Sequence, residues 1–160
     1  MNQEIIDRLQ ARFPSSIRAT EEFRNDLTVT VKTADLVSIA QFLKEDPALA
    51  FDMIIDIVGV DRFREKERFE VNYTLYSLSH KKYLRVKVLV DEDDPTVPTL
   101  TGVWSGANWH ERETYDMFGI KFAGHPDLRR LYMPEEFEYY PLRKDFPLAG
   151  IPDSLPLPRR

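Results

Sequence analysis

The densest group of side chains capable of chemistry lies between residues 108 and 118, in the segment Asn-Trp-His-Glu-Arg-Glu-Thr-Tyr-Asp-Met-Phe. Glu113 and Asp116 are three residues apart, so a helix would bring their carboxyl groups to one side, where they could act as a general acid and base. The neighbouring sequence offers no nucleophile or oxyanion hole. An ion network is the better interpretation, because Arg112 and Asp116 have the i,i+4 spacing of a helical ion pair.

The sequence gives little support for a metal, thiol or nucleotide site. His110 and Glu113 spell H-x-x-E, but a di-iron bundle needs that motif twice together with two further glutamates. His80 and His125 lack a second histidine at the spacing of a zinc site. The chain has no cysteine, which excludes disulfides, thiolate-bound zinc and cysteine-ligated iron–sulfur clusters. No glycine-rich phosphate-binding motif occurs. Any redox cofactor should therefore sit on another chain.

The charge balance points to a protein partner. A net charge of −5 and a pI near 5.3 argue against binding to nucleic acid or to anionic membrane surfaces, which needs a basic footprint. The longest apolar stretch, Met53 to Val60, is broken by Asp56 and falls short of the roughly 20 residues that span a bilayer. The first residues lack the basic and apolar regions of a signal peptide. We expect a soluble chain made in the cytoplasm, with no direct membrane span.

A helix should carry the 108–118 cluster, with Ser105 as its N-cap and Gly119 as its C′ residue. Apolar residues fall on opposite sides of this helix, so we expect it to be buried from two directions. Two further helices are predicted, one over the first dozen residues and one from an N-cap at Thr33 to just before Pro47. Strands are predicted over 27–32, 53–60, 69–79 and 83–90, and the last three of these strands should form an antiparallel meander. With 160 residues, about one domain is expected. The fold class is α+β, with a small mixed or antiparallel sheet covered by helices.

The last 35 residues have a different character. The segment 126–160 holds seven of the eleven prolines, too many for a regular helix or a central strand. It also carries aromatic residues, including Tyr139, Tyr140 and Phe146, that need a surface to cover them. We therefore divide the chain into an α+β domain over 1–125 and an extended C-terminal strap over 126–160, which we expect to dock on partner subunits. The strap also offers Arg129, Arg130, Arg143 and Lys144 as partners for the carboxylates of the 108–118 cluster.

Several short motifs occur together between residues 111 and 147. They are Glu111-Arg112-Glu113, Asp116-Met117-Phe118-Gly119, His125-Pro126, Arg129, Leu131-Tyr132-Met133-Pro134, and Pro141-Leu142-Arg143-Lys144-Asp145-Phe146-Pro147. In kind and spacing they closely resemble the signature of the thirty-kilodalton subunit, or C subunit, of respiratory complex I, the proton-pumping NADH:quinone oxidoreductase. By contrast, Met1 to Asp52 carries no motif that we could name.

The resemblance implies a structural and assembly subunit of the peripheral arm, which supports electron transfer from NADH to quinone coupled to proton translocation. It implies no catalytic, cofactor-binding or metal residue in this chain, with FMN and iron–sulfur clusters on partner subunits. The expected partners are the large hydrogenase-like subunit of the quinone site and the iron–sulfur subunits. The implied location is the cytoplasmic side of the bacterial inner membrane, or the matrix or stroma of an organelle.

Residues expected to hold the structure or the interface are Trp109, Glu111, Arg112, Glu113, Asp116, Gly119, His125, Pro126, Arg129, Pro141, Arg143, Lys144, Asp145 and Phe146. Among them, the four charged residues from Glu111 to Asp116 should join the helix to the strap by charge pairs. Three alternatives stay open: the equivalent subunit of a ferredoxin-, F420H2- or hydrogenase-linked relative, a freestanding hydrolase that uses Glu113 and Asp116, and an adaptor for an unrelated complex.

Overall fold

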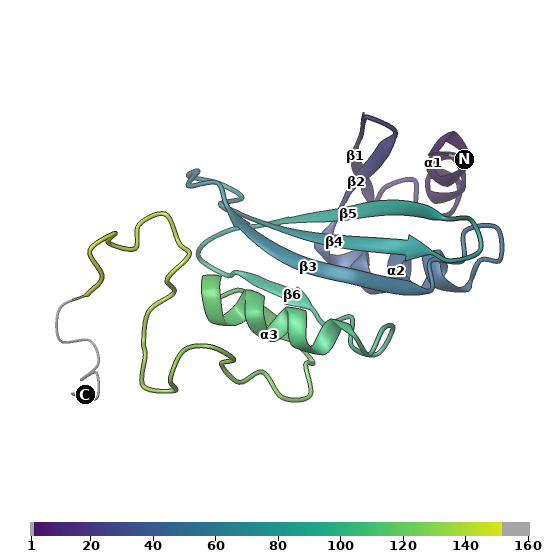
Figure 1. Cartoon of the computed structure of the whole chain (residues 1–160). Helices are drawn as coiled ribbons and strands as arrows, with labels where there is room; N and C mark the ends of the chain where they lie inside the picture. The colour runs from purple at the N-terminus through teal and green to yellow at the C-terminus, as the bar shows by residue number, and fades with distance from the viewer. Residues whose placement is uncertain (1, 152–160) are drawn as a thin grey trace.

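A five-stranded mixed sheet in the order β1-β2-β5-β4-β3 forms the centre of the molecule (Figure 1). The computed structural model describes residues 2–151. The strands are β1 (Ile17–Phe23), β2 (Asp26–Val31), β3 (Met53–Asp61), β4 (Phe69–Ser77) and β5 (Lys82–Val90). The last three form the predicted antiparallel meander, and β2 joins β5 in parallel. The predicted α+β fold with a mixed sheet is confirmed.

Helices cover one face of this sheet. They are α1 (Asn2–Arg12) and α2 (Leu36–Glu45), which follows the 3-10 turn η1 (Thr33–Asp35). Ile5 and Leu9 of α1 and Ile39 and Leu43 of α2 are buried in the same apolar core as the inward side chains of the strands. The expected N-cap at Thr33 is wrong. The chain makes the 3-10 turn first, so α2 begins after Asp35, whose side chain makes no capping hydrogen bond.

Three strands, β1, β6 (Thr96–Pro98) and β7 (Lys121–Ala123), were not predicted from the sequence. The strand β1 is an edge strand with nearly all of its residues exposed, so its sequence lacks the apolar alternation that marks a half-buried strand. The strands β6 and β7 pair in parallel over three residues each. No strand was predicted at either position, because pairs this short leave no periodic signal.

The helix α3 (Ala107–Phe118) runs beside β3 (Figure 1). It begins after Gly106 rather than at the predicted cap Ser105, and it ends at Gly119, whose φ of 76° is left-handed as predicted for a C′ glycine. The Thr114 hydroxyl donates a hydrogen bond of 3.0 Å to the carbonyl of Ile57 in β3. Because β3 is an edge strand, this helix protects backbone groups that another chain could otherwise pair with.

The chain after α3 and β7 contains no regular helix or strand from residue 126 to residue 151. It passes along α3 and then lies beyond the end of the sheet (Figure 1). Phe137 is buried, with its ring centroid 5.6 Å from that of Tyr139 and 6.3 Å from that of Phe146. The strap's final residues, 152–160, lie outside the described part of the chain. Between residues 2 and 151, no helix is long and apolar enough to cross a membrane.

Candidate interface site

Asp116 of α3 is the first point at which the domain holds the strap. Its Oδ2 accepts hydrogen bonds from the backbone N–H groups of Leu131, Tyr132 and Met133, at 3.0, 2.6 and 2.9 Å, and its Oδ1 accepts one of 2.8 Å from Arg130. Burial acts to raise the pKa of this carboxyl, but these hydrogen bonds outweigh it and hold the pKa below its usual range. The strap therefore folds its backbone around one buried, ionised carboxylate, which we call the Asp116 anchor.

The expected i,i+4 pair between Arg112 and Asp116 is wrong. Arg112 turns toward the strap, where its Nε donates to the carbonyl of Arg129 at 3.1 Å and its Nη2 to that of Arg130 at 3.2 Å. Its guanidinium lies 4.8 Å from the ring centroid of Trp109. The physical reason is that Arg130 and the strap's N–H groups already occupy both oxygens of Asp116. Arg112 still joins helix to strap, through carbonyl groups instead of a carboxylate.

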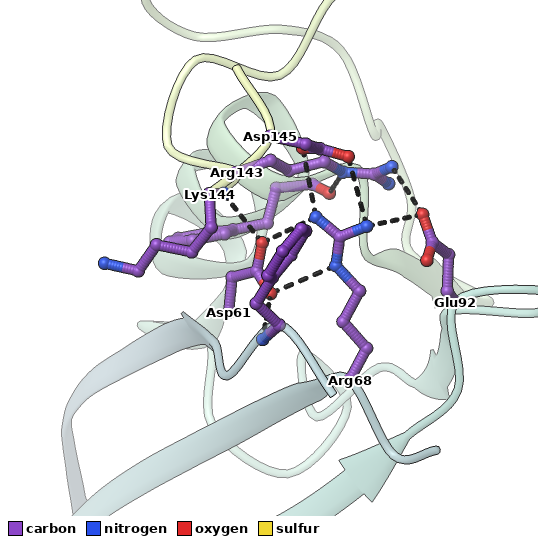
Figure 2. A network of polar contacts seen from close by, with 8 residues as sticks. Asp61, Arg68, Glu92, Arg143, Lys144 and Asp145 are labelled. Atoms are coloured by element: carbon purple, nitrogen blue, oxygen red, sulfur yellow. Dashed lines mark hydrogen bonds and ion pairs between the residues drawn. The ribbon is translucent and has the colours of Figure 1, made fainter. Parts of the chain in front are cut away.

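The second point is Arg68, the residue before β4, whose side chain is only 4% exposed. Figure 2 shows its guanidinium among Asp61, Glu92 and Asp145. Its Nε and Nη2 donate to Asp61 at 3.0 and 2.7 Å, and its Nη1 donates to Glu92 at 2.6 Å and to Asp145 at 3.1 Å. We call these four residues the Arg68 cluster. One guanidinium thus joins the end of β3, the loop before β6 and the strap.

The neighbours of Asp145 in the strap add further contacts to this end of the sheet. The backbone N–H of Lys144 donates to Asp61 Oδ2 at 2.8 Å, while its own side chain stays exposed. Arg143 donates from Nε to the carbonyl of Phe118 at 2.6 Å and lies 4.7 Å from the ring centroid of Tyr140. These contacts fix residues 140–145 against both α3 and the sheet.

The electrostatics of the Arg68 cluster favour the ionised carboxylates. Burial acts to raise the pKa of Asp61, but the hydrogen bonds from Arg68 and from the Lys144 backbone outweigh it, and the pKa lies below its usual range. The hydrogen bond from Arg68 also lowers the pKa of Asp145. Asp61 and Asp145 are therefore ionised at neutral pH, and both pair with the guanidinium of Arg68.

Glu111 does not join helix to strap by a charge pair, contrary to expectation. It is fully buried, and its carboxyl accepts hydrogen bonds from the Leu100 backbone N–H at 2.7 Å and the Thr99 hydroxyl at 2.5 Å. Burial raises its pKa to about 7, because desolvation exceeds the effect of these two hydrogen bonds. Its role in the structure is to bind the loop between β6 and α3.

The basic group next to Glu111 is His125, with 3.9 Å between Nε2 and the carboxyl. The Nδ1 of His125 accepts the N–H of Asp127 at 3.0 Å, and its Nε2 lies 3.2 Å from the carbonyl of Asn108. These partners assign the ring proton to Nε2 and make the imidazole neutral. Glu111 and His125 are therefore adjacent, but they do not form an ion pair in this arrangement.

The remaining residues predicted for the site are scattered. Glu113, Pro126 and Arg129 are exposed, and Arg129 pairs with Asp127 at 2.7 Å, whereas Pro141 and Phe146 are partly buried. Glu113 faces solvent while Asp116 is buried beneath the strap, so the acid–base pair of the hydrolase alternative does not form. Within the described residues, no group of His, Asp and Glu side chains is placed to hold a metal ion.

Sequence reasoning missed the partners of Asp145. Asp61, Arg68 and Glu92 lie in charge-rich segments to which the sequence assigned no contact with the strap. A usable signal existed, because the strands predicted over 53–60 and 69–79 are antiparallel neighbours, so the end of the first and the start of the second lie at the same end of the sheet. The structure pairs Asp61 with Phe69 there. What the sequence could not indicate is that the strap returns to this end.

The family model of the respiratory-chain NADH dehydrogenase 30 kDa subunit matches residues 29–152. The chain belongs to this family. The motifs between residues 111 and 147 lie inside the matched range, so the resemblance seen in the sequence is confirmed. Membership of the NADH dehydrogenase 30 kDa family leaves no basis for a freestanding hydrolase or an unrelated adaptor.

Similar proteins extend this match along most of the chain. The NADH-quinone oxidoreductase C subunit of Roseiflexus sp. (strain RS-1) is 50% identical over 149 residues, which are 93% of this chain and 86% of that protein. The C subunit of the same enzyme from Geotalea uraniireducens (strain Rf4) is 44% identical over 155 residues, 97% of this chain and 93% of that protein.

Solved structures agree with the family. The trypsin-resistant fragment (1-134) of Nqo5 has a TM-score of 0.66 and 35% identity, covering 80% of this chain and all of the fragment. A chain of the archaeal membrane-bound sulfane sulfur reductase has a TM-score of 0.74 at 24% identity, covering 92% of this chain and 86% of its own length. At that identity the second match concerns the fold alone.

Proposed function

We propose that this chain is a structural and assembly subunit of the peripheral arm of NADH–quinone oxidoreductase and holds no cofactor itself. The observation that carries this function is the family match over residues 29–152, together with relatives named as C subunits of that enzyme along most of the chain. In this role it supports electron transfer from NADH to quinone without catalysing a step. The FMN and iron–sulfur clusters would belong to partner subunits.

The cofactor-free role is supported by the chemistry of the side chains. The chain has no cysteine to hold an iron–sulfur cluster. The buried acids of the signature already have structural partners: Asp116 binds the strap, and Glu111 binds the loop before α3. These residues act by fixing geometry.

The proposed docking element is the strap, with the large hydrogenase-like subunit of the quinone site and the iron–sulfur subunits as partners. Its exposed large side chains include Tyr132, Tyr139 and Leu142, residue types that supply contact area in interfaces. The related Nqo5 fragment (1-134) is described as trypsin-resistant, which supports a stable folded domain in this chain. The proposed location is the cytoplasmic side of the bacterial inner membrane, or the equivalent side in an organelle.

The test is to tag the chain in its own host, solubilise membranes gently, purify the chain, and identify every copurifying protein by mass. A hydrogenase-like large subunit and cluster-bearing subunits should copurify, with flavin and iron–sulfur absorbance. A flavin-containing, NADH-oxidising subunit would identify the donor as NADH, whereas a ferredoxin- or F420H2-linked module would replace NADH by that donor. A solitary chain from the membranes would contradict the proposal.

The cofactor assignment needs a separate measurement on the isolated chain. Purified alone, it should show no visible absorbance and no bound iron, because the groups that absorb belong to other subunits. Stoichiometric flavin or iron in the isolated chain would overturn the cofactor-free role while leaving its membership of the complex intact.

A further inference from the structure

Trp109 is a large aromatic side chain on α3 that is left 60% exposed. Its ring lies 4.8 Å from the guanidinium carbon of Arg112, the stacked arrangement of a cation–π pair. Tryptophan and arginine are the residue types most enriched among side chains that dominate binding energy at protein interfaces. The pair is therefore a candidate contact point for a partner protein. The kind of partner depends on how rigidly the pair is held and on its charge.

The guanidinium of Arg112 is fixed in place. Two of its nitrogens donate to consecutive strap carbonyls, those of Arg129 and Arg130, at 3.1 and 3.2 Å. Because the strap is itself held by the Asp116 anchor, helix and strap position this arginine together. A side chain that is already ordered loses little conformational entropy when a partner binds.

Arg112 forms no ion pair with an acid within residues 2–151, although its charge adds to the hydrogen bond from Arg129 in lowering the pKa of Asp127. The two acids that might serve are occupied: Asp116 by Arg130 at 2.8 Å, and Asp127 by Arg129 at 2.7 Å. Carbonyl oxygens stabilise a guanidinium but carry no compensating charge. Its Nη1 also has no acceptor in the described chain, so one face of the group can still receive a carboxylate.

A second exposed aromatic–arginine pair shows what is particular about this one. At the tip of the β1–β2 hairpin, Arg24 lies 5.1 Å from the ring centroid of Phe23, which is 71% exposed. In the described residues Arg24 makes no hydrogen bond to the main chain, so nothing fixes that pair. The Trp109–Arg112 pair is therefore held in one arrangement by the strap, whereas the Phe23–Arg24 pair is not.

We propose that Trp109 and Arg112 form the contact point for an acidic side chain of a neighbouring subunit. The carboxylate would bind the guanidinium of Arg112, and the carbon stem beside it would pack on the indole. Tyr132, which is 62% exposed on the adjacent strap, extends the surface. The inference rests on the proposed function and adds the chemistry of the partner, which is acidic and partly apolar.

The first test compares Trp109→Ala with the matched control Phe23→Ala in the tagged, membrane-purified complex. Both rings are exposed, so neither change should move the melting temperature of the isolated chain. We expect Trp109→Ala to lower the yield of copurifying subunits about tenfold and Phe23→Ala to leave it within about twofold of the wild type. Equal yields from the two variants would overturn the inference, whereas a wild-type chain that copurifies with nothing would instead contradict the proposed function.

The second test concerns the acidic chemistry. Glu113 is exposed one turn from Trp109, so Glu113→Lys places an amine beside the proposed site without disturbing the core. In the purified complex, a carbodiimide should couple this amine to an aspartate or glutamate of a neighbouring subunit. A Ser79→Lys control, in the distant β4–β5 turn, should give no such product. Coupling of Glu113→Lys only within its own chain, or loss of assembly caused by the added positive charge, would overturn the acidic partner.

Discussion

Glu111 is a single buried carboxyl that should control how stability depends on pH. Burial raises its pKa from 4.5 to about 7 in the folded chain, so the folded state binds more protons than the unfolded state between these values. The contribution of Glu111 to the free energy of unfolding is therefore fully present below pH 4.5 and is lost as the pH rises through 7. The loss is about 3 kcal/mol, from ~1.4 kcal/mol for each pKa unit.

Glu111→Gln should remove this dependence, because the amide stays neutral and can still accept from Thr99 or Leu100. The measurement is urea unfolding at pH 5 and pH 7.5, where the wild type should lose stability and the variant should not. The acids whose pKa values are lowered, Asp61, Asp116 and Asp145, titrate below this window and would not obscure it. An unchanged slope in Glu111→Gln would assign the dependence to another group.

The arginines that meet the strap should differ in what their removal costs. Arg130→Ala leaves the buried carboxylate of Asp116 without its cation, and we expect a loss of ~3 kcal/mol. Arg112→Ala removes hydrogen bonds to carbonyls that can be hydrated, and we expect ~1 kcal/mol. Chemical denaturation of both variants at pH 7 tests this order. An equal or larger cost at Arg112 would mean that it carries a charge pair after all.

Among the helices and strands, those with a regular spacing of apolar residues were predicted from the sequence. The helices α1 and α2, the meander of β3, β4 and β5, and the end of α3 at Gly119 all follow from apolar spacing and a glycine that can adopt a left-handed backbone. The strand β1 and the β6–β7 pair leave no such trace. The site was predicted in part: Arg130 was among the bases expected near α3, but its partner depended on where the strap runs, which no local pattern encodes.

Gly119 joins two elements in one residue, since it ends α3 and lies under the strap. Its φ is 76°, and an added Cβ would be 2.6 Å from Tyr140 Cε2 and 2.7 Å from Arg143 Nη2. Gly119→Ala should therefore cost ~1–2 kcal/mol in backbone strain and also displace residues 140–143. We expect a lower melting temperature and faster trypsin cleavage after Arg143. Gly102→Ala is the control, because nothing lies within 4 Å of its added Cβ, and equal behaviour of the two variants would contradict the strap contact.

The whole molecule depends on the strap for stability as well as for assembly. Deleting residues 134–160 keeps the Asp116 anchor, which ends at Met133, but removes Phe137 and the contacts of Asp145 and Lys144 with the sheet. We expect a folded domain by circular dichroism, with a lower melting temperature and no copurifying subunits. Normal assembly of the shortened chain would contradict docking through the strap.

The Arg68 cluster also has a consequence for synthesis on the ribosome. Asp145 follows Arg68 by 77 residues, so at about 5–20 residues per second the strap reaches its site roughly 4–15 seconds later. Once β5 is complete at Val90, all strands of the central sheet exist, yet the end of β3 and the start of β4 stay uncovered until Asp145 arrives. A nascent chain that stalls before residue 145 would expose Asp61 and Arg68, and would offer proteases and chaperones a mark of incomplete translation.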